Sequence, residues 1–410
     1  MTGPARPYPA PLPNVMRPLL ALAALWAAAP GLLSNRPAHS ARPSPAAMAD
    51  TAASVRWTVA ALGLWDAAHA DRRQAAVDAA RGDSTGLQAL RPLPPAGRLW
   101  PLLALAQRDA APHGPAAVAG ASAEALRLLL PASASRQRVA DRLARDPTTH
   151  SDTTGRALGG RLARARLAAH PPDDPAWAGA VPTGPGVWRP APGTAPDGAA
   201  VPTFRPFVLD RADRFRPPPP PAVGSEAFRA ALAEVRQASE ARTPAQRRAA
   251  RFWARRHGAT EWARRAAAAL AREGVPDPGA ADVLARLQVS VYDATIACWE
   301  AKYHYWLLRP EHADPAVTRP WGVDLPNFPA YPSGHACTAG AAGAVLTPAV
   351  PGAAAEVRAA AAEMAESRLW GGVHYRFDNE AGLALGRAVA AYVAAHADRL
   401  APPAGGADGR

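Results

Sequence analysis

Hydrophobic residues recur at helical spacing along the chain. In residues 54–81 the apolar positions follow the period of a helix with one buried face; they are Val55, Val59, Leu62, Leu64, Trp65 and Ala68. Two shorter stretches, 122–130 and 136–143, repeat this pattern. Ser122 and Ser135 stand near their starts, where serine commonly caps a helix. The N-terminal third of the chain is therefore predicted to be helical.

Helices are also predicted after a long irregular region. Residues 155–168 are helical in pattern, whereas residues 171–222 are rich in proline and lack a helical pattern. An irregular connection of this length is unusual inside a compact domain. We therefore expect an extended segment that is pinned across the helices by its aromatic side chains, which are Trp188, Phe204, Phe207 and Phe215. Further helices are predicted over 226–239, 244–257, 261–273, 280–308, 336–346 and 381–396.

Residues 1–48 are interpreted as a signal peptide followed by a linker. Met16 and Arg17 precede an apolar run from Leu19 to Leu33, and Ala38 and Ser40 are placed as a cleavage site. A charged start, a short apolar run and small residues are typical of a secretory signal. The run is short and interrupted by proline, which argues against a membrane span. We expect export to the periplasm or the medium, without a stable membrane span in the mature chain.

Composition narrows the class of partner. Lys and Arg number 46 against 34 Asp and Glu, a net charge of +12, which at first suggests nucleic acid or an acidic membrane surface. The arginines are spread throughout the chain, however, and no basic block alternates with aromatic residues, so no nucleic-acid partner is expected. Cys298 and Cys337 are too few for a disulfide scaffold. Buried free thiols are expected, and a bridge between them stays open.

The first of three polar clusters runs from Lys302 to Pro310. It contains the chain's only lysine, although lysines and arginines together number 46. Lysine offers a compact charge to one oxygen, whereas arginine offers a planar fork. Lys302 and Arg309 are seven residues apart on a helix that is expected to end at Arg309-Pro310. They are therefore predicted to project from one face, two turns apart, toward one anion.

The second cluster, Ser333-Gly334-His335, follows a proline-rich loop and opens an apolar helix. The start of a helix presents free N–H groups and the positive end of the helix dipole, which suit an anion. Gly334 lets the backbone approach an oxygen closely, Ser333 adds a hydroxyl, and His335 is placed to act as an acid or base. Alone, this stretch would equally be a helix cap beside a solvated histidine.

The third cluster contains Arg368, His374 and Asp378. Arg368 offers a planar fork for two oxygens. His374 and Asp378 are four residues apart, so the carboxylate can approach the imidazole and set its tautomer, unless Asp378 pairs with an arginine. Together, the three clusters are suited to bind an oxyanion with the shape of phosphate. His374 is the residue expected to touch the central atom of that anion.

The combined pattern resembles a known superfamily signature. Lys-x6-Arg-Pro, Pro-Ser-Gly-His and Ser-Arg-x5-His-x3-Asp are all present in order. They resemble the motifs of type 2 phosphatidic acid phosphatases, bacterial class A acid phosphatases and vanadium-dependent haloperoxidases. The stretches 328–336 and 372–382 are similar to the haloperoxidase versions, and 184–190 and 215–221 resemble segments of bacterial members. The resemblance extends from about Gly155 to His396.

One departure from that resemblance follows Phe252-Trp253. Bacterial relatives often continue there to a Gly-His-Trp-Asn segment, whereas this chain reads Gly258-Ala-Thr-Glu-Trp262, which displaces His257.

The resemblance implies an all-α fold: a helical bundle of the vanadium chloroperoxidase and acid phosphatase type, with a four-helix core and long Pro-rich connecting loops. One helical domain is expected over 49–400. It comprises N-terminal helices in 49–170, the irregular Pro-rich segment in 171–222 and the catalytic helices in 223–400. A disordered tail is expected over 401–410.

Vanadate is the cofactor that the resemblance implies, with hydrogen peroxide and halide as the substrates. The groups that would hold the vanadate oxygens are Lys302, Arg309, Ser333, the Gly334 amide and Arg368. His374 would ligate vanadium, and His335 would hydrogen-bond the opposite apical oxygen and help to deprotonate peroxide. Phe328 resembles a halide-pocket position that is Phe in chloride-oxidising members and His in several bromide-oxidising ones. That position alone does not assign the halide.

The alternative is an acid phosphatase that uses the same residues on a phosphate ester. His374 would attack phosphorus, His335 would protonate the leaving group, and Asp378 would orient His374. The cations would stabilise the five-coordinate transition state, which vanadate resembles. A non-catalytic anion-binding scaffold is a third hypothesis, against which the complete motif set argues. A polyproline-ligand role for residues 215–221 and assembly into a homo-oligomer stay open.

Overall fold

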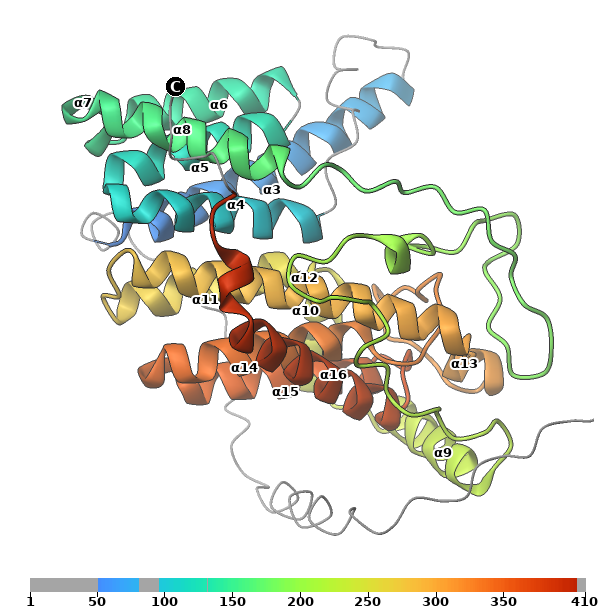
Figure 1. Ribbon diagram of the computed structural model, residues 1–410. Helices are drawn as coiled ribbons and strands as arrows, with labels where there is room; N and C mark the ends of the chain where they lie inside the picture. The colour runs from blue at the N-terminus through green and yellow to red at the C-terminus, as the bar shows by residue number, and fades with distance from the viewer. Residues whose placement is uncertain (1–50, 81–95, 131, 404–410) are drawn as a thin grey trace, which may run out of the picture. The chain divides into compact units, whose positions relative to one another are not determined.

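The computed structural model of the protein describes residues 51–80, 96–130 and 132–403, which lie within the compact unit Ser40–Arg410. The predicted leader, residues 1–48, lies outside the described residues, as do residues 404–410 of the predicted tail. Over the described ranges, regular secondary structure consists of helices plus one isolated bridge between Val187 and Leu307 (Figure 1). The predicted all-α fold is confirmed.

The helices follow one another in this order: α3 (Ala53–Ala80), α4 (Ala96–Ala110), α5 (Pro115–Leu129), α6 (Ser133–Ala144), α7 (Thr148–Ser151), α8 (Thr153–Ala168), α9 (Glu226–Glu240), α10 (Pro244–Ala254), α11 (Gly258–Arg272), α12 (Gly279–Tyr305), α13 (Pro310–Ala313), α14 (Gly334–Ala349), α15 (Ala354–Trp370) and α16 (Arg376–Ala395). Short 3-10 turns are η2 (Ala111–His113), η3 (Val201–Thr203), η4 (Pro351–Ala353) and η5 (Ala397–Leu400). No helix in the described ranges is both long and apolar enough to cross a bilayer.

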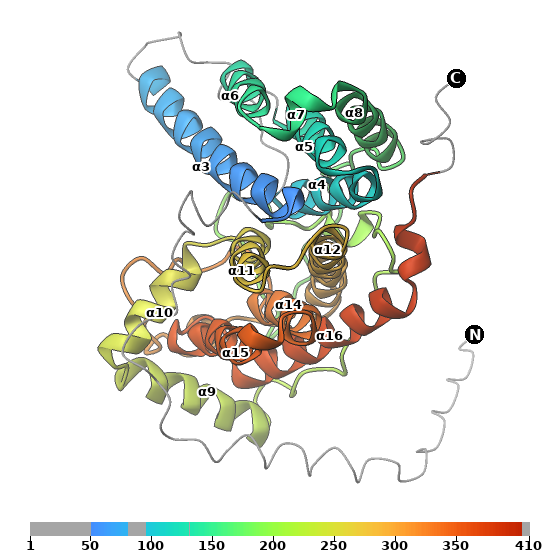
Figure 2. The same cartoon turned by 90° about the vertical axis from the view of Figure 1, so that its left-hand side faces the viewer.

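Helix α12 is the central element. It packs against α14 and α16 on one side and against α4 on another, with α11 also beside it (Figure 2). Its apolar residues, among them Leu284, Val291 and Ile296, are buried. Burial on several sides explains why its sequence is apolar around most of its circumference rather than along one stripe. Because α12 ends in Lys302 and its neighbours, this packing places the first polar cluster in the interior.

The N-terminal parts of α14 and α16 are brought together by glycine. A Cβ on Gly386 would lie 2.1 Å from the carbonyl oxygen of Cys337, and a Cβ on Gly382 would lie 2.6 Å from that of Ser333. Only a residue without a side chain permits this backbone contact. The N–H of Ser333 then donates to the carbonyl of Asp378 at 2.9 Å. The second and third polar clusters therefore meet across two helix starts.

The segment 171–222 crosses the helices as predicted and is pinned by aromatic contacts. Ring centres lie 5.2 Å apart for Phe207 and Tyr292 and 5.8 Å apart for Phe215 and Tyr392. Buried Trp188 packs 6.2 Å from Trp306.

A polar contact that the sequence did not reveal also pins this segment. The buried carboxylate of Asp293 on α12 accepts the N–H groups of Phe207, Val208 and Leu209 at 2.8, 2.9 and 2.8 Å. Three backbone donors of an irregular segment are thus satisfied by one side chain.

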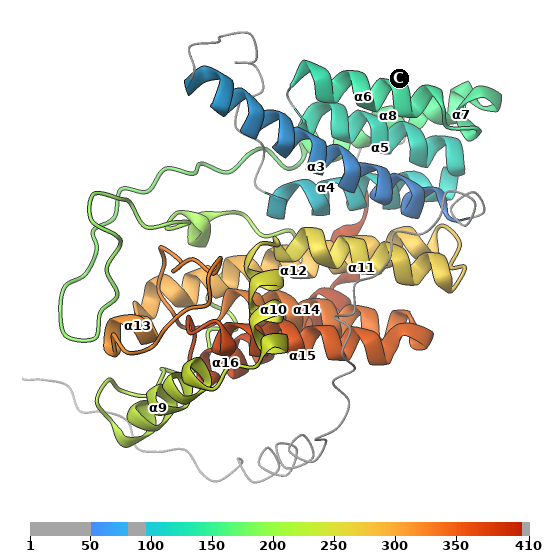
Figure 3. The same ribbon diagram turned by 180° about the vertical axis from the view of Figure 1, so that it is seen from behind.

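Two predicted helix starts are wrong. Helix α5 begins at Pro115, so Ser122 lies in its interior and donates its hydroxyl to the carbonyl of Val118 at 2.7 Å. Ser135 lies inside α6, which begins at Ser133. Proline at a first helical position and the alanine-rich run that follows it extend α5 toward the N-terminus. Elsewhere capping follows the sequence: Thr243 and Gln246 form a capping box at the start of α10, which packs against α15 (Figure 3).

Candidate active site

Lys302 lies in the last turn of α12, but Arg309 lies beyond the helix. Helix α12 ends at Tyr305, and Trp306 adopts a left-handed conformation with φ of 52°. The chain then runs extended: the Trp188 N–H donates to the Trp306 carbonyl at 2.7 Å, and Arg309 precedes α13. The prediction that Lys302 and Arg309 project from one helical face two turns apart is therefore wrong. The helix stops before proline because the segment 306–308 pairs with residues 186–188 instead.

The Lys302 ammonium organises the loop before α14. It is buried and donates to the carbonyls of Pro329, Ala330 and Pro332 at 2.9, 2.8 and 2.5 Å. An ammonium has three donors, so these carbonyls use all of them. Burial lowers the pKa of Lys302 to about 8. Lys302 thus holds the loop that delivers Ser333, and its direct contact with an anion stays a prediction.

Arg309 hydrogen-bonds two backbone segments and the side chain of His374. Its Nε and Nη2 lie 3.1 and 2.9 Å from the carbonyl oxygen of Phe328. Its Nη1 lies 2.7 Å from the carbonyl oxygen of Val373 and 2.9 Å from Nε2 of His374. Burial lowers the pKa of Arg309 to about 9. A guanidinium only donates, so Nε2 of His374 is the acceptor in this contact.

His374 and Asp378 form the expected pair. His374 Nδ1 lies 2.8 Å from Asp378 Oδ2, which also accepts the Tyr375 N–H at 3.1 Å. Helix α16 begins at Arg376, so Asp378 lies in its first turn and faces back toward His374. Because Nε2 accepts from Arg309, the proton of the neutral imidazole is on Nδ1. Burial and the neighbouring cations hold the pKa of His374 well below its usual value, whereas burial raises the pKa of Asp378 to about 7.

Ser333, Gly334 and His335 form the start of α14, as predicted. Ser333 is buried at the N-cap, where its Oγ accepts the Ala336 N–H at 3.4 Å. His335 Nε2 lies 3.0 Å from the carbonyl oxygen of Trp253. A carbonyl only accepts, so Nε2 carries the proton and Nδ1 keeps its lone pair. Burial holds the pKa of His335 well below its usual value, so near neutral pH the imidazole is neutral and Nδ1 carries a lone pair.

Among the three predicted site cations, Arg368 differs in having no hydrogen-bond partner within the described residues. It occupies the last turn of α15, and 3 % of its surface is exposed. Its Nε and Nη1 are buried and have no hydrogen-bond partner within the described part of the chain. Burial lowers its pKa to about 10, so the guanidinium remains charged at neutral pH. An uncompensated buried cation is costly, and contact of Arg368 with an anion stays a prediction.

One cavity of about 390 Å³ joins these residues. Its lining includes Gly334, His335, Arg368 and His374, together with Phe328 and His257. Phe328 packs 5.2 Å from Trp299, and the Arg309 guanidinium lies 4.9 Å from its ring centre. The predicted halide-pocket residue is therefore next to the predicted anion site. His257 lines the same cavity despite its displaced position in the sequence.

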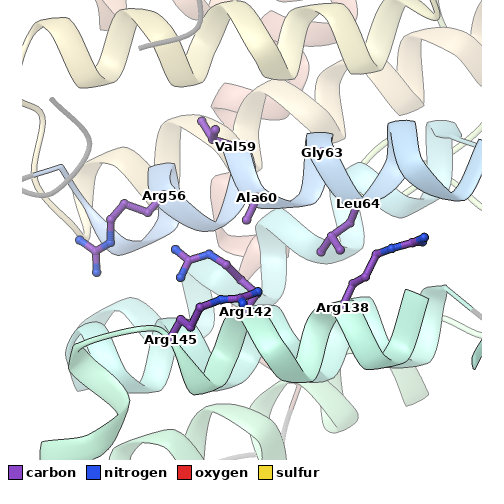
Figure 4. A pocket seen from close by; sticks show the side chains of 8 residues that line it. All are labelled: Arg56, Val59, Ala60, Gly63, Leu64, Arg138, Arg142 and Arg145. Carbon is purple, nitrogen blue, oxygen red and sulfur yellow. The ribbon is translucent and has the colours of Figure 1, made fainter. Parts of the chain in front are cut away.

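A second groove, between α3 and α6, is also lined by arginines. Figure 4 shows its lining, which consists of Arg56, Val59, Ala60, Gly63, Leu64, Arg138, Arg142 and Arg145. Arg138 is paired with Asp71, and Arg142 lies 3.6 Å from Asp146. Neither a histidine nor a nucleophile lines this groove of about 380 Å³ among the described residues.

Cys298 and Cys337 are buried free thiols, as expected. Cys298 lies one turn before Lys302 on α12, and its Sγ lies 3.8 Å from the carbonyl oxygen of Pro332. The thiols therefore pack beneath the loop that leads to Ser333.

Sequence reasoning missed the backbone partners that hold the site. The three carbonyls around Lys302 and the Trp253 carbonyl at His335 come from segments without a motif. The Phe252-Trp253 pair offers a partial signal, because it stands beside the departure at His257.

Comparison with known proteins supports the same superfamily. Residues 284–400, which contain all three clusters, match the family model of the PAP2 superfamily. The crystal structure of the first bacterial vanadium-dependent iodoperoxidase is 24 % identical, with a TM-score of 0.60, and the match covers 73 % of this chain and 90 % of that one. No curated protein matches the chain in sequence.

Bacterial vanadium-dependent chloroperoxidase has the same fold. Its holo form is 18 % identical with a TM-score of 0.60, covering 78 % of this chain and 95 % of that one. Its apo form is 15 % identical with a TM-score of 0.58, covering 74 % and 94 %. The resemblance expected from the sequence is confirmed for the PAP2 segment and for the helical fold.

Proposed function

We propose that this protein is a vanadium-dependent haloperoxidase that oxidises halide with hydrogen peroxide. The observation that carries the proposal is the buried Arg368 guanidinium, whose Nε and Nη1 lack partners in the part of the chain that the structure describes. It lines one cavity with His335 and His374. A tetrahedral oxyanion would supply the missing acceptors and neutralise the charge.

The donor set fits vanadate. Arg368 and Arg309 provide forks for oxygens, the start of α14 at Gly334 provides backbone N–H groups, and His374 provides a neutral nitrogen ligand. No thiolate is needed, because vanadate carries hard oxygen ligands and the imidazole completes them. When bound, vanadate supplies a Lewis-acidic centre that activates peroxide toward halide.

His374 is prepared by its neighbours. Asp378 holds the proton on Nδ1, which directs the Nε2 lone pair away from the carboxylate. That lone pair accepts an N–H from Arg309 at 2.9 Å. Ligation by Nε2 therefore requires Arg309 to turn Nη1 from the imidazole toward an oxygen of the anion. The positive charge of Arg309 remains within the site in either position.

His335 is the acid–base residue of the proposal. Its Nε2–H is held by the Trp253 carbonyl, so its Nδ1 takes the proton. Its depressed pKa means that a proton taken from peroxide is readily returned. The anchoring carbonyl fixes the ring so that Nδ1 keeps one orientation.

An acid phosphatase is the second candidate, favoured by the same His374–Asp378 contact of 2.8 Å. A carboxylate that holds Nδ1–H would also raise the nucleophilicity of Nε2 toward phosphorus. Arg309 and Arg368 would then face the equatorial oxygens of the transition state.

A paired assay decides between the two. Protein loaded with orthovanadate is tested with peroxide and bromide on a phenolic dye, and vanadate-free protein is tested on p-nitrophenyl phosphate. Vanadate-dependent bromination that His374→Ala abolishes would establish the haloperoxidase. Phosphate release that vanadate only inhibits, without bromination, would establish the phosphatase. Unchanged activity in Arg368→Ala would reject both.

A further inference from the structure

The active-site cavity is larger and more apolar than an oxyanion requires. It measures about 390 Å³, within the range of cavities that bind small organic molecules. Beyond the anion-binding groups, its wall is made of aliphatic and aromatic side chains: Val201, Phe204, Val291, Ile296, Trp299 and Phe328. A halide ion beside Phe328, or a peroxide molecule, would leave most of this wall uncovered. The wall suits the apolar body of an organic molecule, and its three rings suit an aromatic one.

Most polar side chains of this wall are already engaged. The Tyr292 hydroxyl donates to Asp173 at 3.0 Å, and the Thr295 hydroxyl donates to the Val291 carbonyl at 2.7 Å. The Thr338 hydroxyl donates to the His335 carbonyl at 2.9 Å.

Arg256, which also lines the cavity, is engaged as well, because it pairs with Glu261 at 3.1 Å. These engaged groups have little capacity left for a ligand.

His257 is different. It precedes α11 at the N-cap position, yet its side chain makes no capping hydrogen bond. It lines the cavity, and neither ring nitrogen has a hydrogen-bond partner among the residues described by the structure. A neutral imidazole offers one donor and one acceptor. It can therefore bind a hydroxyl group, which also both donates and accepts.

We propose that His257 is a specificity-determining residue that hydrogen-bonds the hydroxyl group of a phenol whose ring occupies the apolar wall. This inference rests on the proposed function, because it names the organic acceptor of that site. Asp197 is the other cavity side chain whose carboxylate is uncommitted within the described ranges. An ionised carboxylate only accepts, so the two residues are separated by experiment.

The test measures binding rather than turnover. Full-chain protein without vanadate is titrated calorimetrically with 4-propylphenol and with propylbenzene, which lacks only the hydroxyl group. A hydrogen bond of ordinary strength predicts roughly 3- to 10-fold tighter binding of the phenol. His257→Phe should remove that preference, and His257→Gln, which keeps a donor and an acceptor, should retain part of it. The exposed His113 on η2 provides the matched control, His113→Phe, with the wild-type preference.

Three outcomes overturn the inference: no preference in the wild type, a preserved preference in His257→Phe, or its loss in Asp197→Asn alone. A separate assay of iodide oxidation by the vanadate-loaded wild type tests the proposed function. Phenol preference without iodide oxidation would reject the haloperoxidase and keep the phenol site. Iodide oxidation without phenol preference would reject only the role of His257.

Discussion

Arg309 donates its Nη1–H to Nε2 of His374 across 2.9 Å, and the same lone pair is the one that would ligate vanadium or attack phosphorus. These two uses of Nε2 exclude one another. While the site holds no anion, this contact protects the imidazole from protonation, because an N–H of the charged Arg309 occupies the Nε2 lone pair. An incoming oxyanion would take the Arg309 donor onto one of its oxygens and leave the Nε2 lone pair free for its central atom.

Replacement of Arg309 should change both the affinity for vanadate and the pKa of His374. Arg309→Ala removes a charge-assisted donor, so vanadate affinity should fall roughly 10- to 100-fold. It also removes a cation that lowers the pKa of His374, so that pKa should rise. Equilibrium dialysis measures the first effect, and the imidazole NMR signals measured against pH report the second. Arg309→Lys keeps the charge and should retain the pKa of the wild type; a pKa of His374 that is unchanged in Arg309→Ala would contradict the argument.

Replacement of Arg368 should stabilise the anion-free protein. Its guanidinium is buried with Nε and Nη1 unpaired, and an uncompensated buried charge costs free energy. Arg368→Met keeps the apolar stem and should raise the free energy of unfolding by about 1 to 3 kcal/mol.

The same variant should lose the anion. Vanadate should raise the melting temperature of the wild type and leave that of Arg368→Met unchanged, because ligand binding stabilises only the protein that binds. Chemical denaturation and thermal scans with and without vanadate measure both quantities. A variant that is less stable yet still responds to vanadate would show that Arg368 has a structural role instead.

Asp378 should matter through His374 rather than by contact with the anion. Asp378→Asn preserves the size of the side chain but removes the charge that holds Nδ1–H at 2.8 Å. Loss of such a partner typically costs about 10- to 100-fold in metal affinity or activity. Vanadate affinity and bromination rate are measured beside Asp324→Asn, an exposed control. Equal vanadate affinities and bromination rates in the two variants would show that Asp378 has no role in the site.

The site was predictable where residues close together in the sequence determine their own arrangement. His374 and Asp378 are four residues apart at a helix start, so their contact follows from local structure alone. Ser333 to His335 likewise form the N-terminus that their sequence indicates. Glycine at 382 and 386 then joins these two local structures.

Prediction failed where a distant backbone competes with a local preference. The spacing of Lys302 and Arg309 fits a continuous helix, but the bridge between Val187 and Leu307 ends α12 early. Lysine chemistry suggested an anion, yet three carbonyls of residues 329–332 take its donors. Carbonyl groups belong to every residue, so no sequence pattern marks them. In the sequence His257 stands out only as a departure from the resemblance, because its cavity is assembled from helices far apart in the chain.

Asp293 on α12, which accepts the N–H groups of residues 207–209, makes the free energy of unfolding depend on pH. Its carboxylate is buried, and burial outweighs the three N–H donors of residues 207–209, which raises its pKa from 3.8 to about 6. The folded protein therefore holds a proton that the unfolded chain releases between pH 3.8 and about 6. Stability from this group is full below that window and falls as the pH rises through it, by about 3 kcal/mol in total. Above the window the loss is complete.

Asp293→Asn isolates this contribution from the many other carboxylates. The free energy of unfolding of the wild type, minus that of Asp293→Asn, should fall between about pH 4 and pH 6 and stay level above pH 7. Denaturant titrations at a series of pH values measure this difference. Exposed Asp324→Asn should give a difference without that slope. A difference that rises with pH would mean that the N–H groups of Phe207, Val208 and Leu209 outweigh burial and hold the pKa of Asp293 below 3.8.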